Sequence, residues 1–207
     1  GFELIDTIWT FTGRYVLVDL YAARWLLRQV GVSLIGGFSN EEVMTIATAV
    51  TDLAGAVGLR LQETKTLLGG RTRIERRQHS LGPFPVQIGN GCAGRPCVPS
   101  PRTVSIPTGM KIEGGFGKQT IVHELAHIID WNHGWPGSTS RSYAFDAALT
   151  DYAACDKSFC NPTWENWAEA VTVAVYGVGQ RGERPARWWS AEDRSRIIGA
   201  LRVRAGR

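Results

Sequence analysis

Residues 119–135 read QTIVHELAHIIDWNHGW and contain three of the chain's four histidines. At the centre stand His123, Glu124 and His127 in the order H-E-x-x-H. Positions i and i+4 lie about 40° apart around a helix, so both imidazoles leave one face and can bind the same zinc ion. Glu124 projects beside them, where a carboxylate can take a proton from a metal-activated water and pass it to a leaving amine. The stretch therefore predicts a zinc-binding helix with Glu124 as general base.

Two candidates compete to be the third zinc ligand. His133 follows His127 by six residues, which is the metzincin spacing, but Asp130 stands where that pattern has a glycine, and no later methionine can form a Met-turn. The other candidates are Glu165 and Glu169, four residues apart on a helix predicted over residues 162–176. Carboxylates on a partly buried helix are costly unless they are paired or bound to metal. One glutamate would be a ligand and the other would orient a histidine.

The segments HELAHIID (residues 123–130) and ENWAEAV (residues 165–171), with a tyrosine between them, resemble a family of zinc metallopeptidases. These are the gluzincin-type enzymes related to anthrax lethal factor and the Pro-Pro endopeptidases, and the match covers about residues 115–180. The resemblance implies that the zinc ligands are His123, His127 and Glu165. It also implies that Glu124 is the base and that Glu169 and Asp130 support the ligands from outside the coordination sphere.

The same resemblance implies a catalytic tyrosine shortly before the glutamate helix. Tyr152 is the expected residue and Tyr143 is the alternative; a phenol there can donate a hydrogen bond to the developing oxyanion. The chain departs from the family at Trp167, where phenylalanine is usual, and by the insertion CDKSFC between Tyr152 and Glu165.

The periodicity of the remaining sequence predicts helices on both sides of a short extended region. Helices are expected over residues 14–31, over 39–58 with Ser39 or Asn40 as N-cap, over 162–176, and after SAED at 190–193. Strands are expected in TRIERRQ (72–78), FPVQIG (84–89) and RTVSIP (102–107). The glycine-rich EGGFG at 113–117 is expected to be a flexible loop at the rim of a cleft.

This order predicts an α+β fold, mostly helical, with a small mixed β-sheet in a zincin-like arrangement. Residues 1–70 form a helical part that packs on a catalytic region over residues 71–207, within one compact domain. We expect an edge strand of the sheet beside the H-E-x-x-H helix, where a substrate peptide would add as a further strand. Residues 102–109 are placed to be that edge, with a buried core strand as the alternative.

The four cysteines fall in two equally spaced pairs, Cys92 with Cys97 and Cys155 with Cys160. The simplest pairing closes two small disulfide loops and implies an oxidising compartment, so we expect a secreted protein. A four-cysteine metal site is the alternative, although its spacing is wider than the usual zinc knuckle.

The charge and hydropathy of the chain bear on its partners. The formal net charge is only +4, which favours a solvated surface over nucleic-acid binding. The chain contains no run of about 18 uncharged apolar residues, so the sequence predicts no membrane span.

The sequence as a whole predicts a secreted, monomeric zinc metalloendopeptidase that holds one Zn²⁺ per chain and acts on proteins or peptides. The alternative from another class is a non-catalytic, disulfide-stapled module that binds a partner through tryptophan and arginine. A metzincin-like peptidase with His133 as third ligand is the alternative within the enzyme class.

Overall fold

The computed structural model describes residues 19–77, 96–133, 162–180 and 189–207. These residues form a mixed α+β fold of six helices and four strands, in agreement with the expected class. The helices are α2 (Leu20–Gln29), α3 (Asn40–Val57), α4 (Leu61–Leu67), α5 (Gly114–Asn132), α7 (Pro162–Tyr176) and α8 (Ala191–Arg204). The strands are β1 (Val32–Ile35), β2 (Thr72–Arg77), β3 (Cys97–Ser100) and β4 (Thr103–Pro107).

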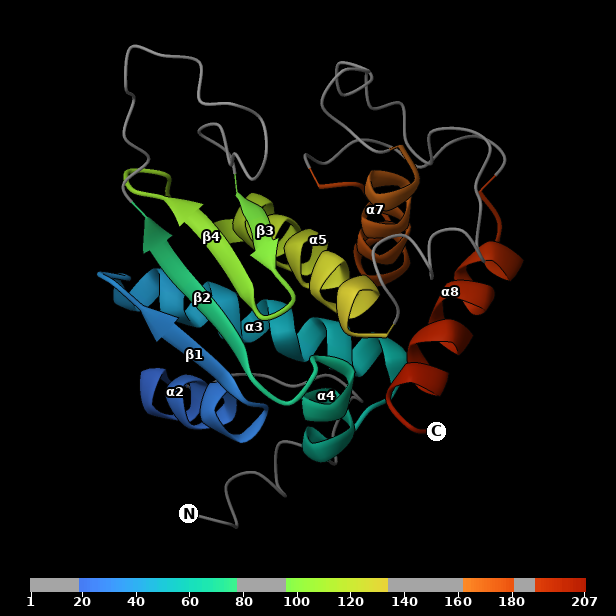
Figure 1. The fold of residues 1–207 in the computed structure, drawn as a ribbon, viewed down its shortest axis with the longest axis horizontal. Coiled ribbons are helices and arrows are strands. Elements are labelled where there is room, and N and C mark those ends of the chain that lie inside the picture. The colour runs from blue at the N-terminus through green and yellow to red at the C-terminus, as the bar shows by residue number, and fades with distance from the viewer. Residues whose placement is uncertain (1–18, 78–95, 134–161, 181–188) are drawn as a thin grey trace.

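The four strands make one mixed sheet in the order β1-β2-β4-β3 (Figure 1). Strands β1, β2 and β4 are parallel, and β3 runs antiparallel to β4. The prediction that residues 102–109 form the sheet edge is therefore wrong, and the alternative, a buried core strand, is confirmed. Strand β4 lies between β2 and β3, and all five of its residues are buried. Within the described residues, the edge strand beside α5 is β3, which contacts that helix.

The segment before residue 70 is not wholly helical. Residues 32–35 form β1, which pairs with β2 through the register of Leu34 with Ile74. This strand has only four residues, too few for a period of two to stand out. The strand expected at 84–89 and the first part of the helix expected at 14–31 lie outside the described residues, and the predicted boundary at residue 70 stays a prediction.

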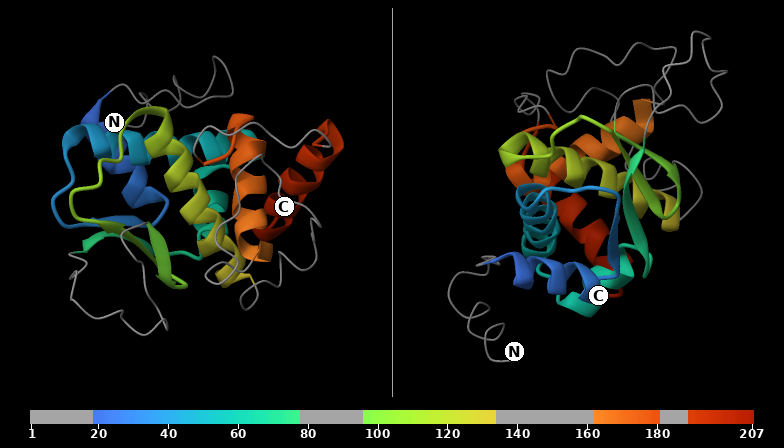
Figure 2. Two further views of the ribbon diagram at one scale, coloured as in Figure 1. Left: turned by 90° about the horizontal axis from the view of Figure 1, so that it is seen from above. Right: turned by 90° about the vertical axis from the view of Figure 1, so that its left-hand side faces the viewer.

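Helices α2, α3 and α5 lie on one side of the sheet (Figure 2). Helix α3 begins at Ser39 with a capping box, in which Ser39 Oγ accepts from the backbone of Glu42 and the Glu42 carboxylate accepts from that of Ser39. It ends at Gly58, whose φ of 77° is the left-handed conformation typical of a helix C-terminus. The apolar residues of α3 lie in the core that also contains residues of α2, α5 and α8.

The residues EGGFG are not a loop but the start of α5. Glu113 is the N-cap and helical structure begins at Gly114. A Cβ atom on Gly117 would lie 2.7 Å from the carbonyl carbon of Ile112 and 3.0 Å from Cγ2 of Thr45. The glycine at 117 thus permits close packing of α5 against α3 and against the chain that leads into α5.

A buried ion pair between Glu42 on α3 and Arg76 on β2 lies beside the segment that leads into α5. Oε1 of Glu42 also accepts from the backbone N–H of Ile112 at 3.2 Å, and Nη1 of Arg76 donates to the Pro107 carbonyl at 2.9 Å. Burial acts to raise the pKa of Glu42, but the hydrogen bonds from Ser39 and Ile112 and the charge of Arg76 together lower it. The ionised pair therefore joins α3, β2 and the segment before α5.

Helices α7 and α8 complete the described fold. Helix α7 packs against α5 and is followed by Gly177 at a φ of 75°, where the sequence predicted its end. Helix α8 begins at Ser190 with the capping box expected from SAED. Among the described residues, no single helix has the length and hydropathy of a membrane span, although α3 and α4 pass that test as a bent pair by length and composition alone.

Candidate metal centre

Three side chains from two helices converge where α5 meets α7. On α5, Nε2 of His123 and Nε2 of His127 lie 3.3 Å apart. From α7, Oε2 of Glu165 lies 3.1 Å from Nε2 of His123, and Oε1 lies 3.6 Å from Nε2 of His127. The helical spacing of the histidines places them on one face, and the packing of α7 on α5 brings the glutamate to that face. Among the described residues this is the one group of three ligand-type side chains with donor atoms within 4.8 Å of one another.

The donor set fits a zinc ion. Zinc binds histidine nitrogen and carboxylate oxygen at about 2.1 Å in tetrahedral geometry, which sets its ligand atoms about 3.4 Å apart. The two histidine nitrogens lie 3.3 Å apart, and Glu165 presents Oε2 to His123 at 3.1 Å and Oε1 to His127 at 3.6 Å, all near that value. Two imidazoles and one carboxylate are also ligands that zinc commonly takes at catalytic sites. Among the described residues, these three side chains can therefore hold a divalent metal such as zinc.

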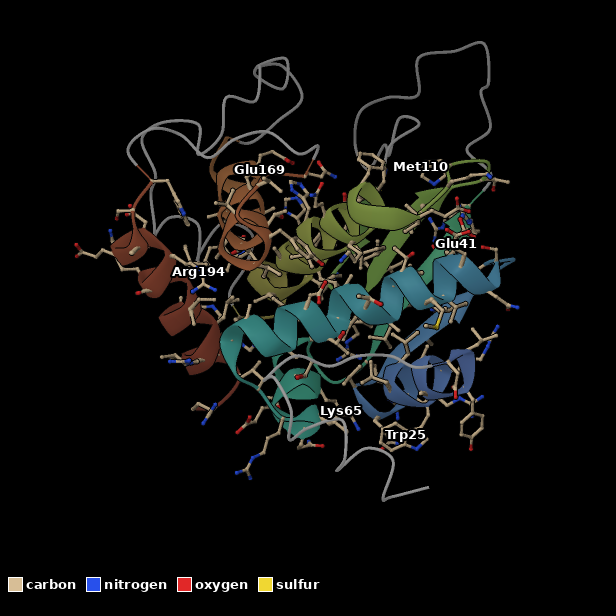
Figure 3. The ribbon with its side chains drawn as sticks, turned by 180° about the vertical axis from the view of Figure 1, so that it is seen from behind. Trp25, Glu41, Lys65, Met110, Glu169 and Arg194 are labelled. Carbon is tan, nitrogen blue, oxygen red and sulfur yellow. The ribbon has the colours of Figure 1, made fainter. Side chains whose placement is uncertain are left out.

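Glu169 supports His123 from the opposite side of the imidazole ring. Its Oε1 lies 3.2 Å from Nδ1 of His123, which is close enough for an ion pair. The angle between the two groups does not meet the geometry of a hydrogen bond. Its Oε2 accepts from the backbone N–H of Gln180 at 3.0 Å. Figure 3 shows Glu169 on the side of α7 that approaches α5. A carboxylate at Nδ1 favours the tautomer that leaves the Nε2 lone pair free for a metal.

The two histidines have opposite pKa shifts. Burial lowers the pKa of His127 to about 4, and the charges of Glu165 and Asp130 counter only part of that effect. Burial also acts to lower the pKa of His123, but Glu165 and Glu169 raise it well above its usual range. His127 is thus neutral at pH 7, whereas without a metal the two carboxylates hold a proton on His123. A cation between these side chains would take the place of that positive charge.

Glu124 is a buried carboxyl group with a strongly raised pKa. It is only 3% exposed, and its Oε2 has no hydrogen-bond partner among the described protein atoms. Burial raises the pKa of Glu124 to about 7, with the charge of His123 opposing and those of Glu165 and Glu169 adding to the shift. A buried carboxyl group without a partner is costly and rare, and a pKa near neutrality suits a group that both accepts and donates protons.

His133 lies apart from this cluster. It is the C-cap of α5, and its Nε2 lies 3.2 Å from the carbonyl oxygen of Leu67. Burial lowers its pKa. The helix does not break after His127 to bring His133 back, so the metzincin ligand set is not what the structure assembles. Asp130 is buried on α5 and acts on His127 through its charge.

Several predicted residues lie outside the described part of the chain. They are Tyr143, Tyr152, Cys92, Cys155 and Cys160, so the oxyanion donor and the disulfide pairing stay predictions. Cys97 is described and is the first residue of β3.

Two contacts at the site were not predicted. The indole N–H of Trp167 donates to the Ala126 carbonyl at 3.0 Å, and the backbone of Gln180 folds back to Glu169. In the sequence, Trp167 stood out only as a departure from the phenylalanine that is usual in the resembled family. Comparison of the chain with protein-family models, with curated proteins and with solved structures returns no match.

Proposed function

We propose that this protein is a zinc-dependent metalloendopeptidase. The observation that carries the proposal is the convergence of His123, His127 and Glu165 beside the buried carboxyl group of Glu124, whose Oε2 has no hydrogen-bond partner among the described residues. The three ligands account for a metal, and the carboxyl group with a pKa of about 7 accounts for proton transfer. The resemblance to gluzincin-type peptidases supports the same assignment.

The exposure of the ligands favours a catalytic over a structural metal site. The side chain of His123 is 4% exposed, but those of His127 and Glu165 are 16% and 38% exposed. Solvent therefore reaches the cluster on the side of these two ligands. A structural zinc is normally closed by four protein ligands, whereas a catalytic zinc has three and an accessible fourth position.

In the proposed mechanism Glu124 accepts a proton from the attacking water and delivers it to the leaving amine. When bound, zinc supplies the Lewis acidity that activates water and polarises the scissile carbonyl. Glu169 keeps His123 oriented by facing its Nδ1. The proposed oxyanion donor is Tyr152, with Tyr143 as alternative, and this assignment rests on the resemblance alone.

Strand β3 is the proposed binding edge for a substrate peptide. It contacts α5, and on the side away from β4 it pairs with no other strand of the described residues. An extended peptide can pair with such an edge through its main chain, which requires no particular side chains. Protein or peptide substrates suit this geometry, and a secreted, disulfide-bonded monomer remains part of the proposal.

The test measures metal and activity on the same samples. We expect wild type to purify with one zinc per chain and to cleave unfolded casein. Glu165→Ala should bind zinc weakly, whereas Glu124→Gln should retain zinc and lose cleavage. Glu192→Ala, which removes an exposed glutamate from the first turn of α8, is the matched control and should change neither. A wild type that neither contains nor binds zinc, or a Glu124→Gln variant that cleaves normally, would refute the proposal.

A further inference from the structure

Trp167 is buried and makes a polar contact with the neighbouring helix. It lies on α7 between Glu165 and Glu169 and is 1% exposed, as expected of a core residue. Its Nε1 nevertheless donates to the carbonyl oxygen of Ala126 on α5 at 3.0 Å. Buried indole groups usually find an acceptor, so the informative feature is which acceptor is used.

That acceptor belongs to the turn of α5 that carries both candidate ligands. Ala126 directly precedes His127 and follows His123 by three residues. Because α5 continues to Asn132, the Ala126 carbonyl lies inside the helix, where its second lone pair is free for the indole. A backbone acceptor within a helix cannot rotate away as a side chain can. The hydrogen bond therefore joins α7 directly to the backbone of the α5 turn.

Three residues of α7 thus contact one turn of α5 within five positions. Glu165 reaches both imidazoles, Glu169 faces Nδ1 of His123, and Trp167 holds the carbonyl between them. The two glutamates contact movable side chains, and their geometry depends on where α7 lies along α5. A shift of about 1 Å between the helices would take Glu165 out of tetrahedral distance from one of the histidines.

We propose that Trp167 is a positioning residue of the metal centre: its indole hydrogen bond to Ala126 sets α7 against α5 so that Glu165 meets both histidines. This inference rests on the proposed metal site, but not on peptidase activity. Trp167 does not touch the metal or a substrate in this role. It acts through Glu165, and its removal should change metal binding more than a loss of packing alone would.

Trp167→Phe tests the inference, because phenylalanine keeps an aromatic ring in the core and lacks the N–H donor. Val171→Ala is the matched control, since Val171 is fully buried one turn further along α7 and its truncation removes packing only. Zinc affinity is measured by competition with a chromogenic chelator, and ligand geometry by the visible spectrum of the cobalt(II)-loaded protein. We expect Trp167→Phe to weaken zinc binding on the order of tenfold and to shift the cobalt bands. Val171→Ala should do neither.

Equal zinc affinity and an unchanged cobalt spectrum in Trp167→Phe would overturn the inference, as would an equal effect of Val171→Ala. A wild type without zinc affinity would instead refute the metal centre and this inference with it. A measurement on wild type avoids any dependence on variant folding. The ¹⁵N-labelled indole N–H of Trp167 should be protected from exchange and should shift when zinc is added; rapid exchange without a response to zinc would contradict the assignment.

Discussion

Replacing Glu124 by glutamine should stabilise the metal-free protein, and the gain should depend on pH. Burial raises the pKa of Glu124 from 4.5 to about 7, so the folded chain holds this proton more tightly than the unfolded chain. Its stabilising contribution is present below about pH 4.5 and is lost as the pH rises to about 7. The difference between a pKa of 4.5 and one of about 7 corresponds to about 3 kcal/mol in the free energy of unfolding. Glutamine has no ionised form, so the variant does not lose this stability as the pH rises.

The assay is urea unfolding of both proteins in EDTA, because a bound cation would favour the ionised carboxylate. At pH 8 the free energy of unfolding of Glu124→Gln should exceed that of wild type by about 3 kcal/mol, or roughly 6 to 12 °C in Tm. At pH 5 the gain should fall below about 1 kcal/mol. Titrating groups that do not interact with Glu124 are common to both proteins and cancel in the difference, whereas the charges of His123, Glu165 and Glu169 act on Glu124 and are part of the expected effect. A difference that is the same at both pH values, or a variant less stable than wild type at pH 8, would refute the reasoning.

Three other predictions follow from contacts around the site. Glu42→Ala should lower the free energy of unfolding, measured by urea titration, by about 3 kcal/mol, because it leaves the buried Arg76 without its carboxylate partner. Substitution of the exposed neighbour, Glu41→Ala, should lower it by under about 0.5 kcal/mol. His133→Ala should leave zinc affinity unchanged in chelator competition, and a loss would revive the metzincin ligand set. Gly117→Ala should lower Tm, because the new Cβ would lie 2.7 Å from the backbone of Ile112. Gly115→Ala, where a Cβ would meet no atom within 4 Å, should raise the free energy of unfolding by up to about 1 kcal/mol. Equal effects of the two substitutions on Tm would contradict the packing argument.

The parts of the fold with long periodic signals could be predicted from the sequence. The N-cap candidates Ser39 and Asn40 and the helical periodicity of residues 39–58 and 162–176 indicated α3 and α7. Short elements could not be predicted in this way. Strands β1 and β3 have four residues each, and β3 arises from a turn-rich cysteine segment. Such strands exist because neighbouring strands pair with them, which is not a property of their own residues.

The order of strands was also beyond the sequence. Residues 102–109 had the composition of an edge strand, with Pro107 near the end, yet β4 is interior. Pro107 lies at the last position of β4, where the missing N–H costs the ladder little. Likewise EGGFG had the composition of a loop, and only the close approach of Ile112 and of Thr45 on α3 gives Gly117 a packing role within α5.

The sequence by itself determined the ligand types and their local geometry. The spacing of His123 and His127 on a helix puts both imidazoles on one face, and the spacing of Glu165 and Glu169 does the same for two carboxylates, because helix geometry is local. Which of the two glutamates meets both histidines was decided by the packing of α7 on α5, which involves residues about forty positions apart. The pKa of Glu124 was likewise decided by tertiary structure, since burial and neighbouring charges arise only when the helices come together.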